Sequence, residues 1–203
     1  MNPFDLNSGS TEDLRRKAKD VLRKRLGALR RALPLASANE RSARIVERLT
    51  EHPWLKSSRA VALYAAIVER REPDLSALVA WLTSRKVRIY YPFMTRVEKG
   101  YSTGFKLLRP GDTLSVQAHR FAEPCNDAPR AERGDIDVVI VPALAVATDG
   151  HRLGSGSGFY DSTLPDICPP ARSIVIGYDF QRLIELPVDP HDWRCDAVIT
   201  DAT

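Results

Sequence analysis

The sequence predicts an α/β protein whose open, mostly parallel sheet carries helices on both faces. Three observations favour this fold class. Residues 135–147 form a near-continuous apolar run, which is typical of a central parallel strand. Two shorter strand-like runs, residues 59–66 and 86–93, are separated by a helical pattern, and together they form a βαβ unit with parallel strands. The chain has no internal repeat and no linker-like segment, so one domain is expected.

The composition fits a globular protein of this kind. Hydrophobic residues make up 43% of the chain and charged residues 28%, which excludes wholesale disorder. No segment approaches the roughly 20 apolar residues that cross a bilayer, and the first residues lack the pattern of a signal peptide. We therefore expect a cytoplasmic protein with a disordered N-terminal tail over residues 1–10 and a single α/β domain over residues 11–203.

Two helices are predicted before the first strand. Apolar residues recur at steps of three and four within residues 11–33, with Ser10 or Thr11 as the N-cap and Pro34 as the stop. This helix carries much of the net charge of +4, because its other positions are largely arginine and lysine. Such a basic helix is either a nucleic-acid-binding face or a solvated surface, and its leucine stripe indicates that one side is buried. A second helix is predicted over residues 37–52.

The remaining elements complete a Rossmann-like arrangement of three layers. Residues 94–134 lack a regular pattern and are expected to wrap the edge of the sheet. A short helix is predicted from Phe159, and residues 172–179 and 196–200 supply two more strands. In such a sheet, ligands bind at the carboxyl ends of the strands, so the loops that follow them are the candidate binding segments.

The loop after the apolar run reads GHRLGSGSGFYDSTL over residues 150–164 and has glycine at positions 154, 156 and 158. Glycines let backbone N–H groups approach an anion closely, and the N-terminus of the following helix adds positive potential. Arg152 would add a bidentate phosphate contact. The loop lacks the GK[ST] ending of a Walker A sequence, so on spacing alone a phosphate-binding loop and an ordinary glycine-rich turn are equally weighted.

Three carboxylates stand where a ligand would bind. Asp161 follows the glycine loop and is either a Mg²⁺ ligand or a first-turn aspartate favoured by the helix dipole. Asp192 would be a second metal ligand if the last loop folds back. Glu72 lies between a strand and a helix, where a carboxylate either holds a polar group of a ligand or caps the helix.

Five motifs, taken in order along the chain, resemble those of one enzyme family. They are KDVLR (19–23), EPDL (72–75), AEPC (122–125), DVVIVPALAVATDGHRLGSGSGFYD (137–161) and PVDPHDWRCDAVITD (187–201). This pattern resembles the 5-formyltetrahydrofolate cyclo-ligase family, also called methenyltetrahydrofolate synthetase, over nearly the whole chain. The resemblance implies a cyclo-ligase-like α/β domain. It also implies the ATP-dependent conversion of 5-formyltetrahydrofolate to 5,10-methenyltetrahydrofolate, with release of ADP and phosphate.

The same resemblance implies roles for individual residues. Asp161 and Asp192 would hold Mg²⁺, while Glu72 and Ile67 would contact the reduced folate. No side chain is assigned a covalent catalytic role, because phosphoryl transfer depends mainly on positioned cations and metal. The residues implied to bind ATP are Lys19, Arg23, Arg152, Leu153, Gly154, Ser155, Gly156, Ser157, Gly158, Phe159 and Tyr160.

Two departures from the family pattern leave alternatives open. The family usually has glycine or a basic residue at Ser157 and often has arginine at Ser162. A family member that binds nucleotide or folate without cyclising activity is therefore the second hypothesis. A nucleic-acid-binding module that uses Arg15 to Arg31 is the third, and it lacks a recognised motif. We expect ATP and a reduced folate as partners, and a monomer that binds neither membrane nor nucleic acid.

Overall fold

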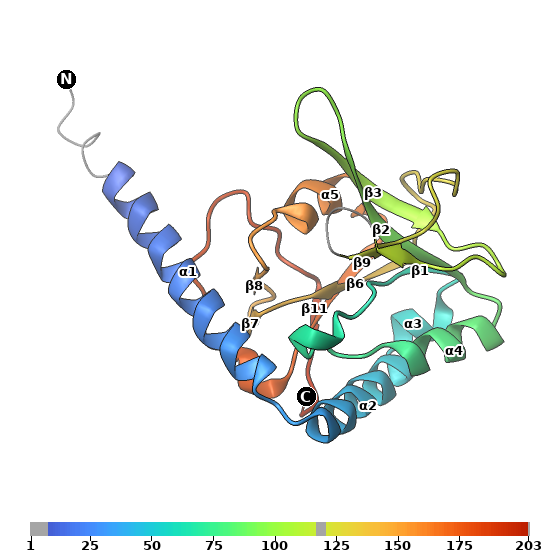
Figure 1. Ribbon diagram of the computed structural model, residues 1–203, viewed down its shortest axis with the longest axis horizontal. Coiled ribbons are helices and arrows are strands. Elements are labelled where there is room, and N and C mark those ends of the chain that lie inside the picture. Colours follow the sequence, from blue (N-terminus) through green and yellow to red (C-terminus); the bar gives the residue numbers. More distant parts are fainter. Residues whose placement is uncertain (1–7, 117–120, 203) are drawn as a thin grey trace.

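The structure is a computed structural model that describes residues 8–116 and 121–202 (Figure 1). Most of the predicted N-terminal tail therefore lies outside the described residues. Helix α1 begins at Ser8, before the predicted N-cap, and ends at Arg31. Pro34 serves as the N-cap of the next helix, so its fixed φ ends one helix and starts another.

The centre of the molecule is a six-stranded sheet with the strand order β11-β9-β6-β1-β2-β3. All neighbouring pairs are parallel except β2 and β3, which are antiparallel. This confirms the predicted fold class, including the parallel βαβ pair formed by β1 and β2. The strands are β1 (Ala60–Ala62), β2 (Arg88–Arg96), β3 (Tyr101–Leu107), β6 (Val138–Pro142), β9 (Arg172–Ile176) and β11 (Ala197–Ile199).

Helices cover both faces of this sheet (Figure 1). Because side chains alternate along a strand, β6 sends Val138 and Ile140 to one face and Val139 and Val141 to the other. The first face packs against α2 (Leu35–Glu51), α3 (Pro53–Ser57) and α4 (Ser76–Ser84), and the second packs against α5 (Phe159–Ile167). Two short 3-10 helices, η1 (Val68–Arg70) and η2 (Asp179–Gln181), lie in the connecting loops.

Two sequence predictions were wrong in detail. The apolar run 135–147 is not one strand, because β6 ends at Pro142 and the chain turns. After the turn, β7 (Ala145–Ala147) joins a second, three-stranded sheet with β8 (Arg152–Leu153) and β10 (Arg182–Leu183). Both strands are buried, so hydrophobicity alone gives no sign of the turn.

Residues 94–134 are also more regular than predicted. They hold the end of β2, the whole antiparallel strand β3, and the short pair β4 (Ser115–Val116) and β5 (Ala122–Glu123). Strand β3 has mixed burial and a glycine at its centre, which weakens the periodic signal of a strand.

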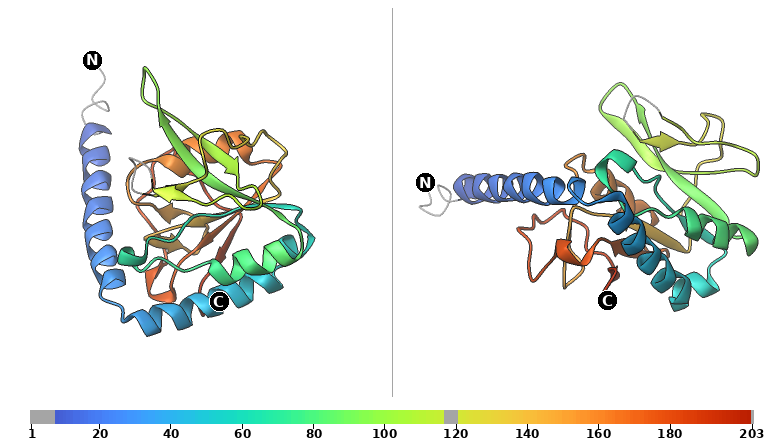
Figure 2. Two further views of the ribbon diagram at one scale, coloured as in Figure 1. Left: turned by 45° about the vertical axis from the view of Figure 1, so that its right-hand side comes forward. Right: turned by 60° about the horizontal axis from the view of Figure 1, so that its bottom comes forward.

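Helix α1 lies along one edge of the molecule, with the rest of the domain on one side of it (Figure 2). Its apolar contacts are few: Leu22 and Leu26 pack against Ala145 and Leu153 of the small sheet. Among the described residues, none of the helices combines the length and apolar character needed to cross a bilayer.

The central strand is expected to dominate stability. Replacing Ile140, which is fully buried, with alanine removes apolar contacts and leaves a cavity, and should lower the free energy of unfolding by about 2–5 kcal/mol. The matched Ile184→Ala change, at a side chain that is 86% exposed, should alter it by less than about 0.5 kcal/mol. Urea unfolding followed by circular dichroism measures both. Equal losses in the two variants would contradict this assignment of the core.

Candidate functional site

A large cleft of about 1050 Å³ opens at the carboxyl end of β6. Helix α1 forms one wall, the glycine loop forms another, and Pro142 and Ala143 lie between them. Eight arginine and lysine side chains and six carboxylates line the cleft. A cleft at this end of a parallel strand is where α/β sheets usually bind ligands.

The glycine loop has the backbone shape that its sequence indicates. Gly156 and Gly158 have φ of +101° and +69°, which side-chain-bearing residues rarely adopt. Gly158 is the N-cap of α5, so the loop leads directly into a helix N-terminus that faces the cleft with its neighbours Phe159 and Tyr160. Backbone N–H groups at such a terminus favour negative charge.

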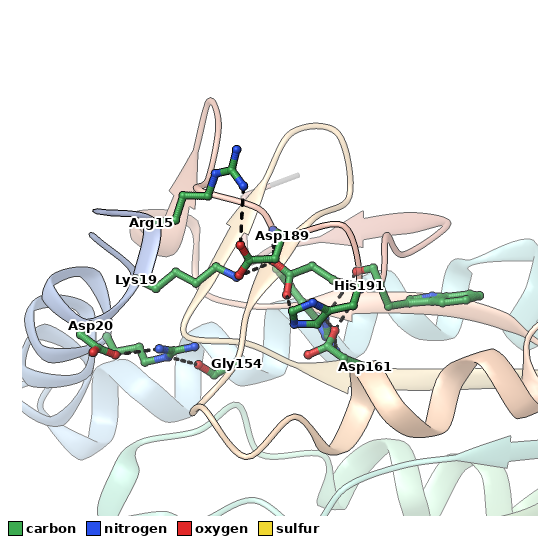
Figure 3. A network of polar contacts seen from close by, with 11 residues as sticks. Arg15, Lys19, Asp20, Gly154, Asp161, Asp189 and His191 are labelled. Carbon is green, nitrogen blue, oxygen red and sulfur yellow. Dashed lines mark hydrogen bonds and ion pairs between the residues drawn. The ribbon is translucent and has the colours of Figure 1, made fainter. Parts of the chain in front are cut away.

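Lys19 joins helix α1 to the last loop of the chain. Its Nζ donates to Asp189 Oδ2 at 2.5 Å and to Asp192 Oδ2 at 2.6 Å (Figure 3). Burial disfavours the charged amine, but the hydrogen bonds and charges of the two aspartates outweigh it and raise the pKa of Lys19. Burial likewise opposes ionisation of Asp192, but the hydrogen bonds from Lys19 and from the backbone N–H of Asp189, together with nearby positive charge, outweigh it and lower the pKa of Asp192.

Arg23 lies one turn further along the same face of α1 and reaches the glycine loop. Its Nε donates to the carbonyl oxygen of Gly154 at 3.1 Å, and its Nη1 forms an ion pair with Asp20 at 2.8 Å (Figure 3). Residues four apart on a helix are neighbours, so Lys19 and Arg23 lie side by side on the wall of the cleft that α1 forms. The structure thus brings the predicted N-terminal pair and the predicted loop together.

Arg152 and Asp161 are bound to each other. Both terminal nitrogens of Arg152 donate to Asp161 Oδ1, at 2.9 and 3.0 Å, and the same oxygen accepts the backbone N–H of Trp193 at 3.0 Å. The Arg152 side chain is only 3% exposed, and its Nε has no hydrogen-bond partner among the described residues. Asp161 is thereby fixed beside the segment that carries Asp192.

Glu72 is held from two sides. Arg30 of α1 donates to Glu72 Oε1 at 3.2 Å, and the backbone N–H of Ile67 donates to Oε2 at 2.9 Å. The guanidinium of Arg30 also donates to the carbonyl oxygens of Arg70 and Ala143. Glu72 lines the cleft, whereas Ile67 contacts Glu72 through its backbone N–H and is not part of the lining found in the described chain.

The carboxylates of the cleft form a different set from the predicted pair. The potential ligand atoms of Asp189, His191 and Asp192 all lie within 4.8 Å of one another, and Asp161 is not a member of this group. Sequence analysis missed Asp189, His191 and Arg30. The close spacing of acid and histidine in DPHD was a signal for the first two, while the arginine run gave no sign of which member faces inward.

A parallel α/β sheet with a glycine loop, a helix N-terminus and a row of cations at its carboxyl edge defines an anion-binding type of site. The chain belongs to the 5-formyltetrahydrofolate cyclo-ligase family, whose model matches residues 15–201. The family resemblance seen in the sequence is thereby confirmed, and with it a ligase-type enzyme.

Individual relatives agree with this membership. The chain is 32% identical to a 5-formyltetrahydrofolate cyclo-ligase of Mycolicibacterium smegmatis, covering 91% of this chain and 94% of the relative. The structure resembles 5,10-methenyltetrahydrofolate synthetase of Aquifex aeolicus with a TM-score of 0.77 and 28% identity, covering 91% and 90% of the two chains. A synthetase from Mycoplasma pneumoniae, at 23% identity, shares the fold with a TM-score of 0.69 over 90% of this chain and 98% of that one.

The Lys19 ion pairs predict a pH-dependent stability. Replacing Lys19 with methionine leaves Asp189 and Asp192 without their cation and should lower the free energy of unfolding by about 1–3 kcal/mol at pH 7. The folded-state pKa of Asp192 lies below its ordinary value of 3.8, so its contribution is complete well above 3.8 and is lost as pH falls from there through the lower, folded-state pKa. The difference between the native protein and the variant should therefore shrink on acidification. Urea unfolding followed from pH 7 down to about pH 2 measures the difference.

Lys17→Met is the matched control, since Lys17 is exposed on the same helix. Its effect should stay within about 0.5 kcal/mol at every pH. A Lys19→Met difference that is constant with pH would contradict the ion-pair assignment.

Proposed function

We propose that this chain catalyses the ATP-dependent closure of 5-formyltetrahydrofolate to 5,10-methenyltetrahydrofolate, with release of ADP and phosphate. Its relatives carry the corresponding names. The observation that carries the proposal is the convergence of four predicted motifs, far apart in the chain, on one cleft. These are the N-terminal cations, the glycine loop, Glu72 and the Asp192 segment.

The triphosphate of ATP would lie between helix α1 and the glycine loop. Lys19 and Arg23 supply positive charge from one wall, and the backbone N–H groups of residues 154–160 supply donors from the other. Arg152 lines the cleft and shares its charge with Asp161, so it would act through the shape of the loop as well as by direct contact. The folate would lie toward Glu72, whose fixed carboxylate is an acceptor for the N–H groups of a pterin ring.

The residues present also fit Mg²⁺. Asp189 and Asp192 already share one cation, the Lys19 ammonium, and carboxylate oxygens are the ligands that Mg²⁺ prefers. We propose that Asp192 and Asp161 hold the ion, as the sequence predicts. Asp189 lies close to Asp192 and could share this role. Asp161 accepts a hydrogen bond from the backbone N–H of Trp193, the residue that follows Asp192. Bound there, Mg²⁺ would neutralise charge that develops on the transferring phosphoryl group.

In the proposed reaction, the formyl oxygen of the folate attacks the γ-phosphorus of ATP and ADP leaves. The second folate nitrogen then attacks the formyl carbon, and phosphate leaves as the ring closes. Lys19 and Arg23 would hold the phosphates in line with the formyl oxygen, and Glu72 would orient the folate. Catalysis of this kind depends on positioning and electrostatic stabilisation more than on covalent help from side chains.

The direct test is an absorbance assay for the methenyl product. Purified protein with MgATP and 5-formyltetrahydrofolate should form the product, while omission of ATP should abolish the signal, because phosphorylation supplies the leaving group. A folded protein that is stabilised by both ligands but forms no product would instead support the binding-only family member suggested by Ser157 and Ser162.

A substitution of Arg23 tests the part of the proposal that concerns ATP binding. Arg23→Met should raise the KM for ATP about tenfold or more and leave the KM for the folate nearly unchanged, since it removes a charged donor from one wall of the cleft. Arg25→Met is the matched control, because Arg25 is exposed and is not among the residues that line the cleft. Steady-state kinetics with each substrate varied in turn measures the effect. Equal changes in both KM values for Arg23→Met would contradict the assignment.

The sequence also predicts where the protein acts and what it binds. We propose a cytoplasmic enzyme whose partners in the reaction are ATP and a reduced folate. The monomeric state and the lack of nucleic-acid and membrane binding stay predictions.

A further inference from the structure

The outer side of helix α1 combines apolar and basic side chains in a regular pattern. Leu14 and Val21 are 63% and 64% exposed, and Ala18, Arg25 and Ala28 are exposed with them. These five residues follow one another at steps of four, three, four and three. At 100° per residue they form one stripe, roughly opposite the buried Lys19, Leu26 and Arg30. We call them the outer stripe of α1.

Steps of four and three are the spacing of a coiled-coil seam. Written as heptads, Leu14, Val21 and Ala28 occupy d positions, and Ala18 and Arg25 occupy a positions. The stripe is about 21 Å long, at 1.5 Å of rise per residue. Leu14, Ala18 and Val21 belong to none of the apolar clusters of the described residues, and α1 lies along one edge of the molecule (Figures 1 and 2). The outer stripe is therefore a surface on which a second helix could pack.

The charges beside the stripe define what that second helix must carry. Lys17, Lys24 and Arg31 occupy three successive g positions, and no ion pair is found for them among the described residues. Side chains at g positions face the e or g positions of a partner helix. A partner with glutamate or aspartate there would form ion pairs along the whole contact, whereas a basic partner would be repelled.

A second copy of this chain does not meet that requirement. In an antiparallel pair the g rows would face each other, cation against cation. In a parallel pair they would face Arg15, Leu22 and Leu29 at the e positions, which offer no carboxylate. The acidic residues of α1 lie elsewhere on the helix, with Asp13 paired to Arg16 and Asp20 paired to Arg23.

We propose that the outer stripe of α1 is a docking surface for an acidic amphipathic helix of another protein. The partner would place apolar side chains on Leu14, Ala18 and Val21 and carboxylates beside Lys17, Lys24 and Arg31. Lys24 and Arg31 also line the cleft, so the docked helix would run beside the opening of the site.

The test uses the full chain and two synthetic three-heptad peptides. Both have leucine at a and d; one has glutamate at all e and g positions and the other has lysine. Repulsion between like flanking charges keeps each peptide from pairing with itself. By fluorescence anisotropy the glutamate peptide should bind at least tenfold more tightly than the lysine peptide, with an affinity that falls as salt rises.

Variants separate the stripe from general charge attraction. The double change Leu14→Ser and Val21→Ser should weaken binding of the glutamate peptide at least tenfold, with the circular dichroism spectrum and the ligase assay unchanged. Ile184→Ser, at an exposed apolar residue far from the stripe in sequence, is the control and should bind like the native chain. Equal binding of the two peptides, or no loss in the double variant, would overturn the proposal.

Nucleic acid and anionic lipid are the two alternative partners that the test must distinguish from an acidic helix. A single-stranded oligonucleotide and vesicles containing phosphatidylglycerol would be attracted by the same cations. The proposal predicts that neither displaces the glutamate peptide at physiological salt. Tighter binding of either one, insensitive to Leu14→Ser and Val21→Ser, would assign the basic row to nucleic acid or lipid instead.

Discussion

The Lys19 ammonium lies between the carboxylates of Asp189 and Asp192, and this contact connects the first helix to the last loop, 170 and 173 residues away. Two carboxylates this close repel each other unless a cation lies between them, so the loop keeps its shape because α1 supplies one. Since α1 has only a small apolar contact with the domain, the ion pairs also fix where the helix lies. The α1 wall of the cleft is therefore held by these ion pairs, together with the contacts of Arg23 to Gly154 and of Arg30 to Glu72.

Helix α1 carries three rows with different tasks. Leu22 and Leu26 pack on the small sheet, Lys19, Arg23 and Arg30 face the cleft, and the outer stripe faces away from the domain. A row of apolar residues one turn apart predicts the first task. The row that faces the cleft is polar and the outer stripe is mixed. The two rows differ in their surroundings, because one faces the rest of the domain and the other faces solvent. For this reason a basic helix of this kind is easily mistaken for a simple solvated face or a nucleic-acid-binding arm.

The sequence predicts the features that depend on local pattern. The buried strands, α4, α5 and the glycine loop follow from periodicity and turn chemistry, and the spacing of four between Lys19 and Arg23 places them on one face. Features set by long-range contacts were missed. The turn after Pro142 lies between two equally apolar strands, and the irregular loop around Asp189 reaches Lys19 by a path that no periodicity encodes. Arg30 is indistinguishable from its neighbour Arg31 until the fold turns it toward Glu72.

The charges of the cleft divide into a paired and an unpaired set. Lys19, Arg30 and Arg152 are each bound to a carboxylate, which fixes the position of their N–H donors and offsets part of their charge. Lys24 and Arg31 have no such partner among the described residues, so they supply much of the positive potential that would attract a polyphosphate. The same two side chains border the outer stripe. An acidic helix docked there would neutralise charge that also favours entry of ATP, so the two ligands would draw on a shared pair of cations.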